Sequence, residues 1–318
     1  YEGMPELKVK IAEWFLNRFQ VKLDPENEIL ILGGSKEGLS LAPVAFLDPE
    51  DYALVPDPAY PVYKTSVLLA GGKVFTFPLL KENNWLPDLK RIKPKGTARM
   101  IFLNYPNNPT GALAPRDSFQ ELVDFAHDKE MIICHDMAYS EITYDGLKSH
   151  SLLEIDNAKE ISLEFFSFSK TYSLTGWRLG FVVGNKELIQ ALTQVKLTFS
   201  SGVFHPIQRA GITALALSQK DLAGLIKTYQ VRRDVLVNGL KELGWDAEFP
   251  KGAIFVWAKT PEPFDSMSVS LSLIQKVGVL TTPGTGLGEQ GKNHIRFSLT
   301  SSVERIEEAL RKMKKFKF

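Results

Sequence analysis

Short apolar runs recur along the first two-thirds of the chain, and this repeat restricts the possible fold more than any other feature. Between the runs lie amphipathic segments such as residues 115–129, where Pro115 suits the first turn of a helix. Alternating strand and helix signals predict an α/β fold with a mostly parallel sheet flanked by helices, and a functional site at the carboxyl ends of the strands. The runs expected to form strands are residues 28–32, 51–56, 73–78, 98–104, 130–136, 162–169 and 178–185.

The pattern changes after Ser218, where a long charged amphipathic segment runs from Lys220 to about Leu243. We therefore expect two domains, a large one over residues 1–218 and a smaller C-terminal α+β domain over residues 219–318. The smaller domain is expected to hold short strands at 253–258, 278–283 and 294–299 and further helices at 267–277 and 303–316.

Charge and cysteine content exclude several classes of protein. The 318 residues include 38 basic and 37 acidic side chains, a net charge of +1, which gives no electrostatic basis for binding nucleic acid or an anionic membrane. No apolar run approaches the roughly 20 residues that span a bilayer. The single cysteine, Cys134, lies in an apolar run and is interpreted as a buried strand residue. Because it cannot form an internal disulfide, we expect a reducing, cytoplasmic location.

The stretch "SFSKTYSLTGWRLG", residues 167–180, is the first candidate for chemistry. Lys170 follows a buried-looking run, and Ser167, Ser169 and Arg178 stand near it in the sequence. A catalytic lysine must be activated, because an exposed amine is protonated at neutral pH. A lysine that bonds a carbonyl, beside serines and an arginine fork that bind phosphate, describes a site for pyridoxal 5′-phosphate. This stretch alone is also compatible with a solvated lysine in a serine-rich loop.

Three other stretches carry polar groups at the ends of expected strands. Gly34 and Ser35 in "ILILGGSKEGLS" stand between a strand and a helix, which is either an anion site or a glycine turn. Asn108 in "FLNYPNNPTGA" lies in a turn-forming segment. In "CHDMAYSEI", Asp136 is suited to hold a pyridinium proton and Tyr139 to bond a ring oxygen, although Asp136 taken alone equally suits a turn.

Taken together these stretches resemble the class I/II aminotransferases of fold type I, which use pyridoxal phosphate. The resemblance covers essentially the whole chain, and the sequences of the motifs are most similar to those of the LL-diaminopimelate aminotransferases and their bacterial relatives. The motifs that carry it are, in order, "GGSKEGL", "PDPAYPVY", "NYPNNPTG", "CHDMAYSE", "SFSKTYSLTGWRLG" and "HIRFSL".

The resemblance implies a role for each matching residue. Lys170 would bond the cofactor's aldehyde and, once released by the substrate, move the proton from the substrate Cα. Asp136 would pair with the pyridine nitrogen and keep it protonated, and Tyr139 and Asn108 would bond the phenolate oxygen. The cofactor would further be held by Tyr60 and Ala138 on its two faces and, at its phosphate, by Gly34, Ser35, Ser167, Ser169 and Arg178.

For the substrate, the resemblance implies that Arg296 in "HIRFSL" clamps the α-carboxylate as a bidentate pair, close to Asn108. Lys36 has two open roles, contact with a distal substrate carboxylate or support of the phosphate. The stretch "SSGVFHPIQRAG" has no arginine before Arg209, where the animal-type aspartate enzymes place one for a distal carboxylate. The strict aspartate specificity of those enzymes is therefore not indicated.

The expected activity is transfer of an amino group between an amino acid and a 2-oxo acid by a ping-pong mechanism, with LL-diaminopimelate or an aspartate- or alanine-type donor. Alternatives are a β-lyase, racemase or decarboxylase on the same scaffold, or a regulatory domain that binds the cofactor without catalysis. A homodimer with its site at the subunit interface is expected. Family members begin several dozen residues earlier, with an arm that crosses to the partner, so we expect that the arm is absent from this chain and that sequence precedes Tyr1.

Two further patterns are interpreted as lacking the function that they superficially suggest. "GLGEQG", residues 286–291, satisfies G-x-G-x-x-G, but it lies between strand-like segments and does not open a helix. We expect an active-site loop there and no nucleotide site. No metal site is expected either, because the histidines are scattered without ligand spacing at His127, His135, His150, His205 and His294.

Overall fold

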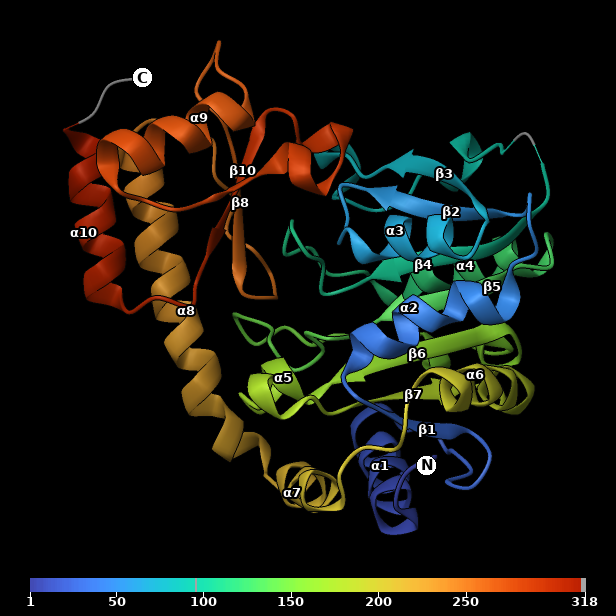
Figure 1. Ribbon diagram of the computed structural model, residues 1–318. Helices are drawn as coiled ribbons and strands as arrows, with labels where there is room; N and C mark the ends of the chain where they lie inside the picture. Colours follow the sequence, from blue (N-terminus) through green and yellow to red (C-terminus); the bar gives the residue numbers. More distant parts are fainter. Residues whose placement is uncertain (95, 316–318) are drawn as a thin grey trace.

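A twisted sheet of seven strands forms the centre of the molecule, and a three-stranded sheet lies beside it (Figure 1). The computed structural model describes residues 1–94 and 96–315, and the strand order within that part of the chain is β1-β7-β6-β5-β4-β2-β3. The strands of the large sheet are β1 (Ile29–Leu32), β2 (Tyr52–Asp57), β3 (Lys73–Pro78), β4 (Ala98–Asn104), β5 (Ile132–Asp136), β6 (Ser162–Ser167) and β7 (Gly180–Gly184).

The sheet is parallel from β3 through β2, β4 and β5 to β6, whereas β7 runs antiparallel to both β6 and β1. The mostly parallel sheet expected from the sequence is therefore confirmed, with β7 as the exception. In the parallel part, Asn104 at the end of β4 is paired with Asp136 at the end of β5. Because β6 ends at Ser167, three residues before Lys170, these polar groups meet at one edge of the sheet.

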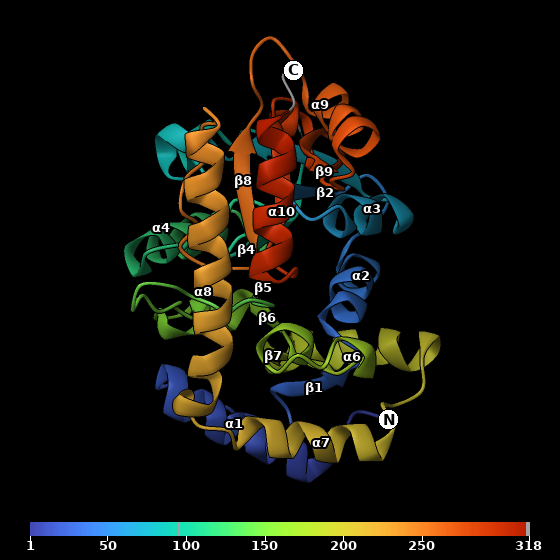
Figure 2. The same cartoon turned by 90° about the vertical axis from the view of Figure 1, so that its left-hand side faces the viewer.

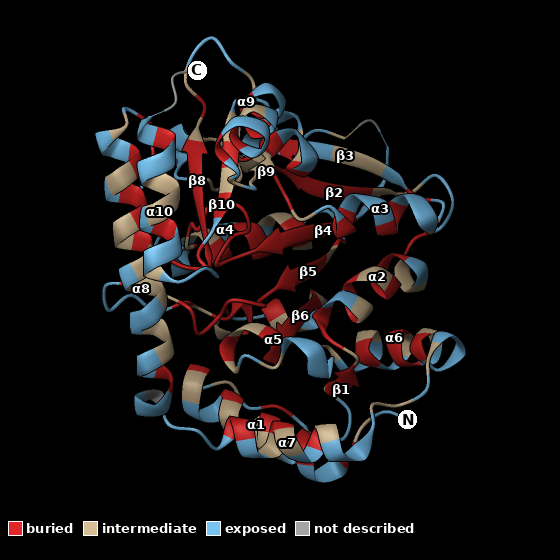
Figure 3. Cartoon of the chain, turned by 60° about the vertical axis from the view of Figure 1, so that its left-hand side comes forward, coloured by how far each residue is buried: buried red, intermediate tan, exposed pale blue. Residues whose placement is uncertain are grey.

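Helices cover both faces of the sheet, as expected for apolar strands. The helices α2 (Ser35–Phe46), α3 (Val62–Leu69) and α6 (Lys186–Phe199) pack on one face. The other face is covered by α4 (Arg116–His127), α1 (Pro5–Phe19) and α7 (His205–Leu215). The buried residues of α4 show why it lies there, because Phe119, Leu122, Val123 and Ala126 form one apolar stripe at helical spacing. Figure 3 shows buried strands between helices whose outer faces are exposed.

The smaller sheet has the order β8-β10-β9 and is antiparallel. Figure 2 shows the long helix α8 alongside α10, next to β8, and the buried side chains of these elements form one apolar cluster. The segment expected to form one helix at 267–277 is α9 followed by a wider π-helical turn, Leu273–Val277. The elements of this region are α8 (Gln219–Glu242), β8 (Phe255–Lys259), α9 (Ser266–Ser272), β9 (Thr282–Pro283), β10 (His294–Ser298) and α10 (Val303–Lys314).

The closing helix expected at 303–316 is α10, and Phe316 lies outside the described residues. Cys134 is buried in β5, where burial raises the pKa of its thiol. Among residues 1–94 and 96–315, no helix has both the length and the apolar character needed to cross a membrane.

Candidate active site

A cavity of about 260 Å³ lies where the carboxyl edge of the large sheet faces β8 and β10. Its lining includes four cationic side chains and one carboxylate, so the cavity suits an anionic ligand. The residues that line it are Ser35, Lys36, Tyr60, Asn104, Asn108, Asp136, Ala138, Tyr139, Ser167, Ser169, Lys170, Thr175, Arg178, Phe255 and Arg296.

Asp136 occupies the end of β5 and is buried. Its Oδ2 accepts a hydrogen bond from the Tyr63 hydroxyl at 2.7 Å, and its Oδ1 accepts one from the Ala138 backbone N–H at 3.1 Å. Burial raises the pKa of Asp136, and these two hydrogen bonds oppose that rise by stabilising the carboxylate. The side-chain amide of Asn104 donates to the Asp136 backbone carbonyl at 2.7 Å, which fixes the end of β5 against β4.

Lys170 lies in α5 (Phe168–Thr171), the short helix that begins directly after β6. Its pKa is lowered chiefly by burial, next by the positive charges of Arg178 and Arg296, while Asp136 acts in the opposite direction. The free amine is therefore present at a lower pH than for an exposed lysine, and the free amine is the form that attacks a carbonyl or accepts a proton.

The third part of the cavity is a group of donors that suits phosphate. Gly34 has a φ of 95°, and a Cβ there would lie 2.5 Å from Nη2 of Arg178, so the close approach of the guanidinium requires glycine. Ser35 begins α2, whose amino end carries partial positive charge. Ser167 accepts from the Ser169 backbone N–H, and the Ser169 hydroxyl is buried with no hydrogen-bond partner among the described residues.

Arg296 reaches the cavity from β10, on the opposite side from the large sheet. Its Nη1 donates to Oδ1 of Asn108 at 2.8 Å, and its Nη2 donates to the Thr282 hydroxyl at 3.3 Å. The guanidinium also lies over the ring of Phe255, 4.2 Å from the ring centre. Burial lowers the pKa of Arg296 from its usual high value, and an arginine side chain stays charged in proteins. The arginine is thus held in place with a charge that a carboxylate can pair with.

The remaining expected residues lie around the same cavity. Ala138 and Tyr139 are buried on the segment after β5, and the Tyr139 ring packs edge-on against Phe255. Burial raises the pKa of the Tyr139 phenol, so it remains a proton donor. Tyr60 is half-buried at the cavity, and Lys36 is exposed at its margin. The structure therefore brings together the site residues proposed from the sequence, with Gly34 next to Arg178 instead of in the lining. The loop at 286–291, expected at the active site, does not line the cavity and bonds Asp57 instead.

Sequence reasoning missed three residues that line this cavity and a fourth, Tyr63, that bonds Asp136 from outside the lining. Tyr63 was not singled out because an aromatic residue in an apolar helix is normally a core residue, although "DPAYPVY" was among the quoted motifs. Asn104 stood in "NYPNNPTG" without a role, and its amide in fact bonds Asp136 and, through Oδ1, the Asn108 backbone N–H at 2.7 Å. Thr175 and Phe255 carry no signal in the sequence that identifies them.

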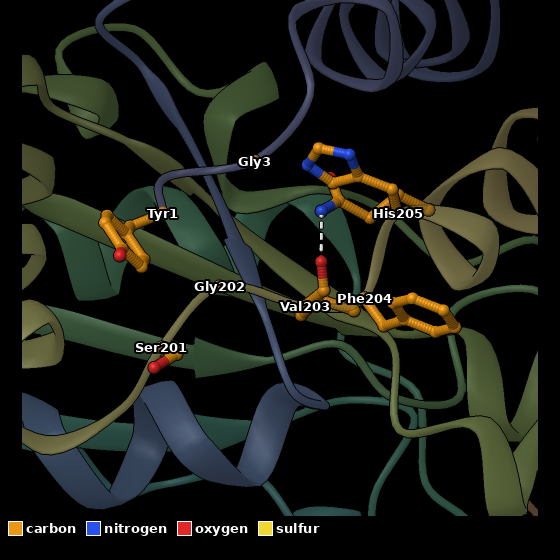
Figure 4. A pocket seen from close by; sticks show the side chains of 8 residues that line it. Tyr1, Gly3, Ser201, Gly202, Val203, Phe204 and His205 are labelled. Atoms are coloured by element: carbon orange, nitrogen blue, oxygen red, sulfur yellow. Dashed lines mark hydrogen bonds between the residues drawn. The ribbon is translucent and has the colours of Figure 1, made fainter.

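A larger cavity of about 490 Å³ lies beside the amino-terminal residues (Figure 4). Its edge is ordered by a hydrogen bond from the Gln208 side-chain amide to the Val203 carbonyl at 2.6 Å. Among the described residues, no lysine or carboxylate lines it, so this lining lacks the groups that an imine-forming cofactor needs. The residues around it are Tyr1, Gly3, Ser201, Gly202, Val203, Phe204, His205 and Gln208.

The residues of the 260 Å³ cavity fit pyridoxal phosphate on chemical grounds. The unpartnered Ser169 hydroxyl, the Arg178 fork and the glycine turn suit a phosphate. A lysine with a lowered pKa suits an aldehyde, and a buried carboxylate suits a protonated ring nitrogen.

Comparison with known proteins agrees with this chemistry. Residues 1–313 match the model of the family "Aminotransferase class I and II". The chain therefore belongs to the class I and II aminotransferases, and it is a pyridoxal-phosphate-dependent enzyme that transfers amino groups between amino acids and 2-oxo acids.

Similar proteins share nearly the whole chain. An LL-diaminopimelate aminotransferase of Halothermothrix orenii is 47% identical over 316 residues, which are 99% of this chain and 81% of that protein. One from Syntrophobacter fumaroxidans is 46% identical over 321 residues, 100% of this chain and 82% of that protein. Among solved structures, BacF from Bacillus subtilis superposes with a TM-score of 0.96 at 37% identity, covering 99% of this chain and 81% of that one.

Proposed function

We propose that this aminotransferase uses LL-diaminopimelate as an amino donor. The observation that carries the proposal is the similarity to LL-diaminopimelate aminotransferases, at 45–48% identity over 98–100% of the chain. Such a substrate carries a second carboxylate and ammonium group far from the reacting carbon. Lys36, exposed at the margin of the cavity, has a charge suited to the distal carboxylate, and its alternative role is support of the phosphate.

We infer the following division of labour at the cavity. Bound pyridoxal phosphate supplies an electron-withdrawing ring that stabilises negative charge at the substrate Cα. The Asp136 carboxylate, held by Tyr63 and Ala138, accepts a hydrogen bond from the ring nitrogen. Lys170 Nζ removes the proton from the substrate Cα, for which its lowered pKa suits it. Tyr139 stays a neutral donor because burial raises the pKa of its phenol.

The residues that bind the cofactor's phosphate and those that bind the substrate carboxylate act at the two ends of the cavity. Ser35, Ser167, Ser169 and Arg178 bind phosphate oxygens, with Gly34 leaving the space that Arg178 needs. Arg296, held by Asn108, would present its fork to the substrate α-carboxylate, and Tyr60 and Ala138, which both line the cavity, would hold the ring. These roles are supported by the position of every one of these residues at a single cavity or directly beside it.

A panel of amino donors tests the substrate. The holoenzyme is assayed with LL-diaminopimelate, aspartate, glutamate and alanine against 2-oxoglutarate as acceptor. The expected result is the highest kcat/KM with LL-diaminopimelate. A higher value for alanine or aspartate would overturn the proposed donor and leave the family assignment in place. Release of pyruvate and ammonia from cystathionine, which carries a leaving group at its β carbon, is measured separately and reports the less favoured lyase activity.

We also propose a homodimer whose subunit interface completes the site. Three aromatic side chains near the amino terminus support it, because Tyr1, Phe199 and Phe204 are 82%, 66% and 69% exposed. Gly202 lies against Tyr1, so these residues share one region of the surface. Sedimentation should give a dimer, and a fully active monomer would contradict the proposal.

The domain division and the location are proposals as well. We propose domains at residues 1–218 and 219–318, supported by the separate seven-stranded and three-stranded sheets. Independent unfolding of a fragment 219–318 would test this division. A cytoplasmic location is supported by the single buried Cys134, and fractionation of cells tests it.

A further inference from the structure

The G-x-G-x-x-G segment at residues 286–291 has a structural role that the active-site cavity does not explain. None of its residues lines that cavity. The segment belongs to η7 (Gly284–Leu287) and η8 (Glu289–Gly291), two short turns that connect β9 to β10. In Figure 1 these orange-red turns lie between the small sheet and the ends of β2 and β3, and hydrogen bonds join them to residues at the end of β2.

The contact centres on Asp57, the last residue of β2. Its carboxylate accepts two backbone hydrogen bonds, from the N–H of Glu289 to Oδ2 and from the N–H of Gln290 to Oδ1, both at 3.1 Å. The backbone N–H of Ala59 donates in the other direction, to the Leu287 carbonyl at 2.8 Å. Since Asp57 is buried, the two bonds from Glu289 and Gln290 replace water that the carboxylate would otherwise need.

The approach is close enough to require glycine in the loop. Gly288 has a φ of 140°, and a Cβ at this position would collide with Oδ1 of Asp57. Gly284 and Gly291 also face each other so closely that a Cβ on either would meet the backbone of the other. Two glycines of the motif therefore serve the tight fold of this loop, Gly288 against Asp57 and Gly291 against Gly284, in place of the phosphate binding that the motif superficially suggests.

The same loop is continuous with the strand that carries Arg296. Residues 284–291 connect Thr282 in β9 to β10, and Arg296 in β10 is paired with Thr282 across the small sheet. Arg296 bonds Asn108 of the segment after β4, while the loop bonds Asp57 at the end of β2. Hydrogen bonds thus join the small sheet and its loop to the carboxyl edge of the large sheet at two places, through Arg296 and through residues 289–290.

We propose that Asp57 is a positioning residue for substrate binding. By holding the loop at 288–290, its carboxylate sets the distance between the two sheets and thereby keeps Arg296 opposite Asn108. Asp57 itself does not line the active-site cavity. The inference rests on the proposed role of Arg296 in binding the substrate carboxylate, and its structural part can be tested without substrate.

Hydrogen exchange of the apo-protein measures the contact directly. In Asp57→Ala, the amides of Glu289 and Gln290 lose their acceptor, and peptides covering 284–291 should exchange about tenfold faster or more. Gly288→Ala should also speed exchange in these peptides, because the added methyl group would push the loop away from the Asp57 carboxylate. Peptides of β4 and β5 should keep wild-type protection, which shows that the variants are folded. The control is Asp51→Ala, which removes a carboxylate that accepts the Asp48 N–H at 3.0 Å just before the same strand.

Kinetics of the holoenzymes then test the consequence for substrate. Asp57→Ala and Gly288→Ala should raise the KM for the amino donor by about tenfold with a smaller change in kcat, and Asp51→Ala should not. When Gly288→Ala is combined with Asp57→Ala, it should raise the KM for the amino donor by a smaller factor than it does in the wild-type protein. The reason is that the carboxylate that the added methyl group would meet is gone.

Unchanged exchange at 284–291 in Asp57→Ala would overturn the contact. Faster exchange with an unchanged KM would overturn the positioning role. Arg296→Lys, assayed in parallel, separates this result from the underlying assignment, because an unchanged KM there would refute the role of Arg296 itself.

Discussion

The hydroxyl of Tyr63 donates a hydrogen bond to Oδ2 of Asp136 at 2.7 Å, and both side chains are buried. Tyr63 also stacks on Phe102, with ring centres 5.1 Å apart, so its ring is held by packing. Burial and the neighbouring carboxylate raise the pKa of the Tyr63 phenol, which keeps it a donor. The carboxylate proposed to hold the ring nitrogen is therefore itself held by a residue outside the cavity lining.

Tyr63→Phe should lower kcat by about tenfold and change the KM for the amino donor less. Without the hydroxyl, one of the groups that stabilise the Asp136 carboxylate is lost, so the pKa of Asp136 rises and the ring nitrogen is less strongly protonated. The measurement is kcat together with a pH titration of the cofactor's absorbance. Tyr105→Phe is the matched control, because its buried hydroxyl also makes a 2.7 Å bond, to the Trp85 carbonyl. Equal effects of the two variants would show that Tyr63 acts on stability alone.

Arg296→Lys should raise the KM for the amino donor by about tenfold to a hundredfold and leave the affinity for pyridoxal phosphate unchanged. Lysine keeps the charge but loses the fork that pairs with a carboxylate and with Asn108. Steady-state kinetics and a cofactor titration measure the two quantities. Arg232→Lys, which alters an arginine bonded to the Leu299 carbonyl, should leave both unchanged.

Gly34→Ala should weaken binding of pyridoxal phosphate by about tenfold, because the added methyl group would displace the Arg178 guanidinium. Pyridoxal, which lacks the phosphate, should lose much less affinity. Gly146→Ala is a strict control for backbone strain, since Gly146 also has a positive φ, of 75°, with no atom within 4 Å of the added Cβ. A similar loss of cofactor affinity in both variants would argue against the Arg178 contact.

Arg178→Gln should shift the pH dependence of Lys170 to higher pH. Burial and the charge of Arg178 lower the pKa of Lys170 in the folded protein, and removing that charge makes the protonated amine less unfavourable, so the pKa rises. The rate at which the apo-protein combines with pyridoxal should then fall at neutral pH. The pH below which this rate declines should be higher than in the wild-type protein. Arg305→Gln, at an exposed arginine of α10, serves as the control. If the pH below which the rate declines stays the same or becomes lower, the electrostatic cause is contradicted.

The sequence predicted the strands well because each is a short buried run with turn residues at its ends. Each of the seven segments expected as strands before Ser218 overlaps a strand of the large sheet. Strand direction was less accessible, because the apolar run of β7 looks the same whether it is parallel or antiparallel to β6. The short β9 was overestimated as residues 278–283, since an apolar run does not reveal where its pairing ends.

The candidate site was accessible where side chains follow strands directly, as Asp136 and Lys170 do, because parallel strands end at one edge. Their catalytic roles stay predictions. Tyr63 and Asp57 were not accessible in the same way, because their importance depends on contacts with residues 73 and more than 230 positions away. The loop at 286–291 was expected to be part of the active site, and it instead contacts Asp57 beside it.

Lys170 Nζ is proposed to move the substrate proton, and Lys170→Ala separates this role from cofactor binding. The variant is loaded with pyridoxal phosphate, mixed with saturating amino donor, and followed by the absorbance of the bound cofactor in a single turnover. Because the lysine is the proposed proton carrier, the half-reaction should slow by at least about a hundredfold while cofactor remains bound. Lys64→Ala, at an exposed lysine of α3, should react as the wild type does. Wild-type turnover by Lys170→Ala would contradict the claim.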